Sequence, residues 1–274
     1  MMEIGIIGYG NMGSVIAQQL KNNYDVLVFE KDKDKIKDLP GIAIAASIAE
    51  LATRAGIIIF AVKPQDFEDI LSEIGDNKKN KLFISIAAGI STAYIEKKLG
   101  AVKVIRAMPN MPARICEGMT CLAQGEFAGL EDLDLAENLF DYLGETLIIE
   151  ESMMNQATAV SGSGPAYVCN FLESQNFDPK NIPEQKKNIF LDDFQNAAQG
   201  IGFNAEDARF LVNTTFNGTI SFLKRGNLLL SELRRQVTSK AGTTEAALEV
   251  LNRGGTLSDA VKRAAERAAE LARG

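Results

Sequence analysis

The chain opens with the stretch that decides its fold, IGIIGYGNMG at residues 4–13. The isoleucines predict a buried strand of a parallel sheet, and apolar residues at helical spacing over 12–20 predict a helix directly after it. Between the two lies G-x-G-x-x-G, in the strand–turn–helix setting that a dinucleotide fingerprint requires. We expect Gly8 to permit a tight turn, Gly10 to let the backbone approach a pyrophosphate, and Gly13 to let helix and strand pack closely. The plainer alternative is an ordinary strand-to-helix turn without a nucleotide.

The residues that follow alternate between strand and helix patterns. Glu30 ends the second expected strand, residues 25–30, where the fingerprint expects an acid that binds the ribose hydroxyls of adenosine. This alternation predicts a Rossmann-type, doubly wound parallel sheet in a dinucleotide-binding domain, residues 1–150. Further strands are expected at 42–45, 56–62, 82–86, 102–107, 119–123 and 145–149.

Two features interrupt the regular pattern. Residues 108–112 contain two prolines and predict a rigid loop that excludes both helix and strand pairing, at a strand end where open α/β sheets bind ligands. From about Glu151 the chain shows long helical patterns without strand candidates. Residues 151–274 are therefore expected to form an all-helical domain that provides the surfaces for dimerisation.

The composition excludes several classes of protein. A hydrophobic content of 46% excludes disorder, and a net charge of −7 argues against a nucleic-acid partner. No apolar run reaches the length of a membrane span, and the first strand begins too early for a signal peptide. The three cysteines lack a C-x-x-C spacing and are typical of reduced thiols in a cytoplasmic protein without a metal site.

The absence of histidine from the sequence limits the possible chemistry. It excludes dehydrogenases that use a His–carboxylate pair, Ser-His-Asp and Cys-His hydrolases, and His-ligated zinc sites. Chemistry here must use lysine, hydroxyl, carboxylate or backbone groups, or a substrate that arrives already protonated.

Several motifs, in their order, resemble the pyrroline-5-carboxylate reductase family over most of the chain. They are Gly8–Gly13 with Asn11 and Met12, AVKPQ at 61–65, RAMPNMP at 106–112, GSGPAY at 162–167, and Leu233–Thr244. The resemblance implies a reductase that transfers hydride from NAD(P)H to the cyclic imine of pyrroline-5-carboxylate and makes L-proline. It also implies a homodimer with interleaved helices, assemblies up to a decamer, and an active site completed by a loop of the partner subunit.

The same resemblance assigns site residues. It implies that the substrate carboxylate and ring nitrogen are bound by Ser239, Gly242, Thr243 and Thr244. The cofactor is then bound by the glycine turn, with Asn11, Met12, Glu30 and Lys31, and by Val62, Lys63, Pro64, Ala88, Asn110 and Pro112.

Elementary chemistry agrees with these roles. A cyclic imine nitrogen is far more basic than a carbonyl oxygen, so hydride delivery to the iminium needs positioning and desolvation and no strong acid. Residues 242–244 at a helix start supply N–H groups and hydroxyls for a carboxylate, and we expect the Thr244 hydroxyl to meet the ring nitrogen. The alternatives are a flexible helix cap at 239–244, a structural kink where subunits cross at 162–165, and a plain helix-start lysine at Lys63. Tyr167 is expected to be a core aromatic.

Three departures from the family pattern bear on function. Glu30 stands where many members carry Asn or Ser followed by Arg, so its carboxylate favours NADH over NADPH, with Lys31 as partial compensation. The loop usually written S-P-G-G-T-T reads SKAGTT, with Lys240 and Ala241 in place of proline and one glycine. Residues 176–188, with two prolines, resemble an insertion and predict a helix break with a polar loop.

Three other functions stay open at this point. The chain could reduce another cyclic imine, or a β-hydroxy-acid-type substrate with a lysine as general acid, although no convincing copy of that lysine motif is present. It could also bind NAD(P)H without turnover, as a sensor or scaffold, which only the altered loop and the insertion support.

Overall fold

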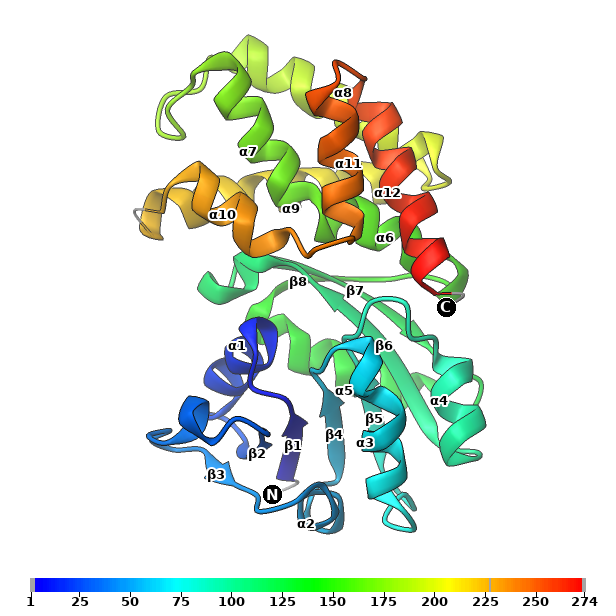
Figure 1. The fold of residues 1–274 in the computed structure, drawn as a ribbon. Coiled ribbons are helices and arrows are strands. Elements are labelled where there is room, and N and C mark those ends of the chain that lie inside the picture. Colours follow the sequence, from blue (N-terminus) through cyan, green and yellow to red (C-terminus); the bar gives the residue numbers. More distant parts are fainter. Residues whose placement is uncertain (1–2, 227, 273–274) are drawn as a thin grey trace. The chain divides into compact units, whose positions relative to one another are not determined.

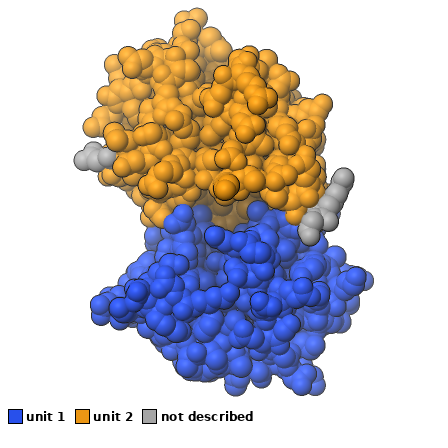
Figure 2. All heavy atoms as spheres, in the orientation of Figure 1, with its two compact units in different colours: residues 1–107, 122–142, 148–151 blue, residues 108–121, 143–147, 152–274 orange. Residues whose placement is uncertain are grey.

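The computed structural model describes residues 3–226 and 228–272. Contacts divide the chain into two compact units, coloured separately in Figure 2. The sequence predicted two continuous domains that meet after residue 150, whereas these units are discontinuous in sequence. The domain boundary stays a prediction. Unit 1 contains residues 1–107, 122–142 and 148–151, and unit 2 contains residues 108–121, 143–147 and 152–274.

An eight-stranded sheet runs in the order β3-β2-β1-β4-β5-β6-β7-β8 (Figure 1). Strands β1 to β6 pair in parallel, as the alternating pattern predicts. The strand order reverses between β1 and β4, and open sheets of this kind bind ligands at the carboxyl ends beside such a switch point. The strands are Glu3–Ile7 (β1), Asp25–Phe29 (β2), Ala43–Ile44 (β3), Ile57–Phe60 (β4), Leu82–Ser85 (β5), Lys103–Pro109 (β6), Gly118–Gln124 (β7) and Gly144–Ile148 (β8).

Both faces of the central parallel strands β4 and β5 are buried, which explains their continuous apolar runs. Ile58 and Phe60 of β4 belong to one core cluster with Phe83 and residues of α2, α3 and α4. Ile57 and Ile59 alternate with them toward the other face and are also buried, and α1 packs against β1 and β2. The sheet is therefore doubly wound. The helices of unit 1 are Asn11–Leu20 (α1), Ile48–Arg54 (α2), Phe67–Ile74 (α3), Thr92–Leu99 (α4) and Leu130–Phe140 (α5).

The proline-rich stretch at 108–112 differs from the prediction. We expected neither strand nor helix there, yet β6 continues through Pro109 and a 3-10 turn covers Met111–Ile115. The expectation was wrong because each proline occupies a tolerated position. Pro109 is the last residue of its strand, and Pro112 lies in the first turn of a helix, where its missing N–H leaves no bond unmade.

The direction of β7 also differs from that of the earlier strands. Asn110 N donates to Met119 O at 3.1 Å, and Gly125 N donates to Val104 O at 2.8 Å. Because the partner numbers fall on one strand as they rise on the other, β6 and β7 form an antiparallel hairpin. The parallel part of the sheet thus ends at β6, and the short connection at 110–117 joins β6 to β7 without the long crossover that parallel strands need.

Unit 2 is mostly helical, and the helix expected to break between residues 176 and 188 does so (Figure 1). α7 ends at Gln175, and α8 begins after Pro183. Phe171 of α7 stacks on Phe190 of α8 with ring centroids 4.5 Å apart, so an aromatic contact closes the pair of helices. That this segment is an insertion stays a prediction. The helices are Met154–Ala157 (α6), Gly164–Gln175 (α7), Glu184–Gly200 (α8), Ala205–Gly226 (α9), Leu230–Val237 (α10), Thr243–Asn252 (α11) and Leu257–Leu271 (α12).

Local signals set the start of α12. Thr256 and Asp259 form a capping box, in which Asp259 N donates to Thr256 Oγ1 at 3.1 Å and Thr256 N donates to Asp259 Oδ2 at 3.1 Å. Across the described residues, each helix is either too short or too polar to cross a lipid bilayer.

Candidate active site

The three glycines of the opening turn serve different structural needs. Gly8 has a φ of +100°, and a Cβ there would lie 2.5 Å from Ala61 O. A Cβ on Gly13 would lie 2.2 Å from Gly8 O, so the close packing of α1 on β1 requires this glycine. A Cβ on Gly10 would meet nothing within 4 Å. Gly8 and Gly13 thus shape the turn itself, whereas Gly10 borders open space.

The N-terminus of α1 opens toward this space. Gly10 is the N-cap, and Ser14 N makes the first intrahelical bond, to Gly10 O, at 3.0 Å. Among the described residues no side chain caps this end, and the first turn carries no acid. The N–H groups of Asn11, Met12 and Gly13 and the positive end of the helix dipole therefore fit a phosphate, which is the test that a dinucleotide site must pass.

Alanine at two of these glycines should have opposite effects. Gly10→Ala should leave the thermal unfolding transition close to that of the parent but weaken dinucleotide binding at least about tenfold, because its methyl group fills the phosphate approach. Gly13→Ala should cost about 1–3 kcal/mol of stability through overpacking. Thermal unfolding and a fluorescence titration with NADH measure both effects. Unchanged NADH binding by Gly10→Ala would contradict a phosphate at this turn.

A cavity of about 290 Å³ lies beside the turn, at the carboxyl ends of β1, β2 and β4. Of its charged and polar residues, Lys35 and Asp66 were missed by the sequence analysis, and Gln65 belongs to the AVKPQ motif but was assigned no role. Of the remaining predicted residues, Pro64 starts a 3-10 turn and Ala88 is exposed after β5. The structure brings six predicted residues together in this cavity: Gly8, Gly10, Glu30, Lys31, Val62 and Lys63.

Glu30 is held in the cavity as a carboxylate. Tyr9 N donates to its Oε2 at 2.7 Å and Asp32 N donates to its Oε1 at 3.0 Å. Burial raises the pKa of Glu30, but these hydrogen bonds and the nearby charge of Lys35 outweigh it and hold the pKa below its ordinary value. Lys35 Nζ lies 3.9 Å from Glu30 Oε1. The cavity therefore presents a negative charge with a lysine beside it.

Lys31 is engaged elsewhere. Its Nζ lies 2.8 Å from Asp66 Oδ1, and this hydrogen bond raises the pKa of the Lys31 ammonium. Lys31 is thus paired with Asp66, which follows β4. Because the Asp66 carboxylate neutralises much of the field of the Lys31 ammonium, Lys31 offsets the charge of Glu30 only in part.

Three hydroxyl groups meet in unit 2. Thr244 Oγ1 donates to Ser163 Oγ at 3.0 Å, and Thr243 Oγ1 lies 3.2 Å from the same oxygen. Ser163 is fully buried and Thr244 is 4% exposed. Ser163 follows a π-helical segment, Thr158–Gly162, at the start of α7, whereas both threonines open α11. The G-S-G-P motif was the sequence signal for Ser163, but its contact with the threonines has no local signature.

Tyr167 supports this cluster from the core. It is 1% exposed, and its hydroxyl donates to Ala159 O at 3.0 Å, as expected of a core aromatic with a satisfied polar end. Burial raises the pKa of Tyr167, although the Ser163 hydroxyl acts in the opposite direction. Tyr167 is therefore a neutral phenol and not a proton donor of ordinary acidity.

The predicted substrate loop forms a tight turn before α11. Gly242 N donates to Ser239 O at 3.0 Å, and a Cβ on Gly242 would lie 2.1 Å from Ser239 Oγ. Glycine is thus required where the turn enters the helix. The turn places the Ser239 hydroxyl beside Gly242, the N-cap of α11.

Asn110 and Pro112 belong to unit 2, apart from the other predicted cofactor residues. Asn110 is 2% exposed, and its Oδ1 accepts from Met119 N at 2.9 Å while its Nδ2 donates to Ser161 O at 3.3 Å. The amide thus ties the β6–β7 hairpin to the π-helical segment. Its role beside a cofactor stays a prediction.

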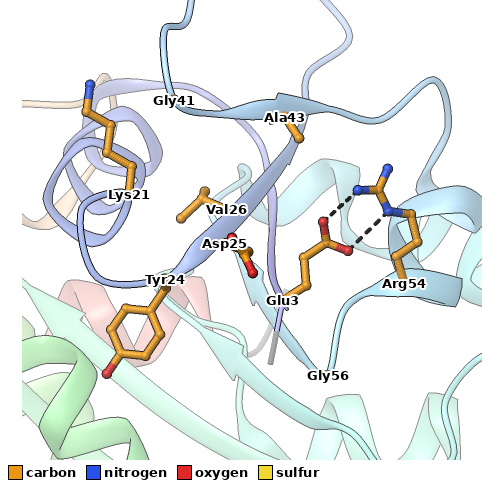
Figure 3. Close-up of a pocket in the computed structure, with 9 residues that line it drawn as sticks. All are labelled: Glu3, Lys21, Tyr24, Asp25, Val26, Gly41, Ala43, Arg54 and Gly56. Atoms are coloured by element: carbon orange, nitrogen blue, oxygen red, sulfur yellow. Dashed lines mark hydrogen bonds and ion pairs between the residues drawn. The ribbon is translucent and has the colours of Figure 1, made fainter. Parts of the chain in front are cut away.

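A second cavity, of about 650 Å³, opens at the amino ends of β1 and β2 (Figure 3). There Glu3 pairs with Arg54, whose Nη2 lies 2.6 Å from Glu3 Oε1. Although it is larger than the cavity beside the glycine turn, it lies at the edge of the sheet opposite to the one where such folds bind ligands. We therefore do not assign it to the active site.

Comparison with known proteins agrees with this architecture. Residues 3–89 match a family model described as NADP oxidoreductase coenzyme F420-dependent. Residues 188–273 match a model described as pyrroline-5-carboxylate reductase dimerisation, which supports self-association through this region.

Relatives match over nearly the whole chain. It is 32% identical to the pyrroline-5-carboxylate reductase of Mycobacterium tuberculosis, over 93% of this chain and 90% of that protein. The solved pyrroline-5-carboxylate reductase of Coxiella burnetii is 31% identical, with a TM-score of 0.64 over 98% of this chain and 97% of that one. The enzyme of Plasmodium falciparum, solved with NADP bound, is 26% identical, with a TM-score of 0.64 over 99% and 98%.

The doubly wound sheet, its glycine turn and the matched NADP oxidoreductase model define a nicotinamide-dependent oxidoreductase. The relatives make the assignment narrower. The chain belongs to the pyrroline-5-carboxylate reductase family, which confirms the resemblance drawn from its motifs.

Proposed function

We propose that this protein reduces pyrroline-5-carboxylate to L-proline with NADH or NADPH. One observation carries the proposal beyond family membership. In a chain without histidine, the buried hydroxyls of Ser163 and Thr244 meet the half-buried hydroxyl of Thr243 at the N-terminus of α11. This combination suits a substrate with a carboxylate and a basic ring nitrogen, because it offers N–H groups and hydroxyls but no strong acid.

Each proposed site residue has a distinct task. The N–H groups at the start of α11 and the hydroxyls of Ser239 and Thr243 bind the substrate carboxylate, with Gly242 permitting the turn. The Thr244 hydroxyl contacts the ring nitrogen, which keeps its proton and becomes the amine of proline. When bound, the reduced nicotinamide supplies the hydride that adds to the imine carbon. Burial around Thr244 excludes water and so strengthens these polar contacts.

We further propose that NADH is the preferred cofactor. The support is electrostatic: Glu30 is a carboxylate that accepts hydrogen bonds from Tyr9 N and Asp32 N and has room on its remaining lone pairs for ribose hydroxyls. A 2′-phosphate at the same position would face this charge, which Lys35 and the paired Lys31 offset only in part. The other proposed cofactor contacts are Asn11, Met12, Val62, Lys63, Pro64, Ala88, Asn110 and Pro112.

We also propose a homodimer formed by the helical residues 151–274, with further assembly up to a decamer, in the cytoplasm. The match of residues 188–273 to the dimerisation model supports this arrangement. In such a dimer the loop at 239–244 of one subunit would complete the nicotinamide site of the other.

The test is oxidation of NADH and NADPH by the purified protein with pyrroline-5-carboxylate. We expect turnover with both cofactors, a higher kcat/KM for NADH, and formation of L-proline in equal amount to the cofactor oxidised. Dinucleotide binding without turnover would overturn the proposal. Turnover only with another cyclic imine would redirect it to that substrate.

A further inference from the structure

The turn before α11 has an unusual occupant at its tightest position. The hydrogen bond from Gly242 N to Ser239 O closes the turn, which places Lys240 and Ala241 at its centre. Ala241 has a φ of +56°, in the left-handed region that glycine adopts freely and alanine does not. Lys240 is not among the positive-φ residues, so the turn is of the type in which proline followed by glycine is the favoured pair.

Two side chains from outside the turn hold Ala241 in this conformation. Ala241 N donates to Glu245 Oε2 at 2.6 Å, and Arg267 Nε donates to Ala241 O at 2.9 Å. Glu245 belongs to the first turn of α11 and Arg267 to α12, and these two helices pack together. Both polar groups of the strained residue are therefore bonded to charged side chains.

Arg267 is itself held in place. Its Nη1 lies 2.7 Å from Glu270 Oε2, and Arg263 Nη1 lies 2.8 Å from the other oxygen of the same carboxylate. Arg263 pairs with Glu266 and Glu270 of its own helix, whereas Arg267 also reaches the turn with its Nε. The two arginines therefore share one partner but differ in whether they touch the loop, which makes Arg263 a matched control.

We propose that Arg267, together with Glu245, is a positioning residue for the substrate loop. The two side chains keep residues 239–242 in the conformation that proline and glycine at 240 and 241 would favour by themselves. This inference rests on the proposed function in one respect, namely that the loop binds the substrate carboxylate. The bracing of the turn does not depend on it.

Loss of the contacts that Arg267 and Glu245 make with Ala241 should affect substrate binding more than catalysis or cofactor binding. Loosening the turn lets the Ser239 hydroxyl and the N–H groups at the start of α11 diverge, so the carboxylate loses an ordered site. Thr244 lies inside the helix and keeps its bond to Ser163. The dinucleotide cavity is built from residues of unit 1 and lies outside the loop.

The experiment compares Arg267→Met with Arg263→Met in the full-length protein. We expect Arg267→Met to raise the KM for pyrroline-5-carboxylate and the Kd for L-proline about five- to tenfold, the loss expected for one ordinary hydrogen bond. The kcat and the Kd for NADH should change less than about twofold. Arg263→Met should leave all of these values near those of the parent, although it too loses the Glu270 pair.

A rescue and a structural readout make the result decisive. In a Lys240→Pro, Ala241→Gly background, Arg267→Met should change the KM and the Kd for L-proline little, because proline and glycine hold that turn without the contact from Arg267. Amide hydrogen exchange at 239–244 should rise in Arg267→Met and in Glu245→Gln, but not in Arg263→Met. Unchanged exchange and KM in Arg267→Met would overturn the proposal. If amide exchange at 239–244 rises in Arg267→Met but the parent protein reduces no imine, the role of Arg267 in holding the turn is supported and the proposed function is rejected.

Discussion

Thr244→Ala should lower kcat/KM for pyrroline-5-carboxylate roughly 30- to 100-fold, the cost of losing one hydrogen bond to a charged group in a water-poor site. The Thr244 hydroxyl is 4% exposed and already anchored to Ser163, so it is oriented before substrate arrives. Thr244→Ser, which keeps the hydroxyl, should recover most of the activity. Steady-state kinetics with saturating NADH measures the effect.

Ser163→Ala should follow the same direction with a smaller loss, because Ser163 orients Thr244 without touching substrate. The matched control is Ser161→Ala. Its hydroxyl is equally buried and lies in the π-helical segment that Ser163 follows, but it donates to Ala157 O at 3.1 Å. If Ser161→Ala and Ser163→Ala lost activity equally, the effect would be structural. An unchanged kcat/KM in Thr244→Ala would contradict the proposed contact between the Thr244 hydroxyl and the ring nitrogen of the substrate.

Glu30→Gln should shift the ratio of kcat/KM values from NADH toward NADPH at least about tenfold, because it removes the charge that repels a 2′-phosphate. Glutamine keeps the size and an acceptor oxygen for Tyr9 N. Asp32→Asn is the control: Asp32 carries a carboxylate in the same turn, and its Oδ2 lies 3.7 Å from Lys35 Nζ, but it does not line the cavity. Kinetics with both cofactors measures the ratio.

The preference for NADH over NADPH also has a predicted pH dependence. The pKa of Glu30 lies below its ordinary value of 4.5, so the carboxylate stays charged from neutral pH down through that value. Discrimination against NADPH, and the stability that the hydrogen bonds to Glu30 provide, should persist over this range and fade only as the pH falls through the lowered pKa. A parent protein that already prefers NADPH would mean that Lys31 and Lys35 dominate the site.

The sequence was sufficient where structure follows from local pattern. Gly8 and Gly13 each have a steric reason to be glycine, and residues 57–60 form a strand because every side chain is apolar and both faces are buried. The helix break before α8 was also predictable, because Pro183 at its N-cap cannot continue a helix. In each case the sequence pattern that signals the feature lies within a few residues of it, although the atom that a side chain at Gly8 would meet belongs to Ala61.

The sequence was insufficient where two distant segments share one task. Ser163 meets Thr244 across 81 positions and Arg267 reaches Ala241 across 26, and neither pair has a spacing that helical or strand periodicity would reveal. Lys35 was missed because it reads as one more charge in a charged turn. Pro109 led to a wrong prediction of a loop at 108–112, because a proline can be the last residue of a strand as well as a residue that prevents one.

The path of the chain through the two units has a consequence for its synthesis. Unit 1 needs residues 148–151 and unit 2 needs residues 108–121, so neither is one uninterrupted segment. A ribosome must release the chain to residue 151 before the nucleotide-binding unit has all its parts, and by then the helical unit already has some of its own. A cut after residue 150 would leave residues 108–121 and 143–147 of the helical unit in the first fragment, so the second fragment would lack part of its own unit.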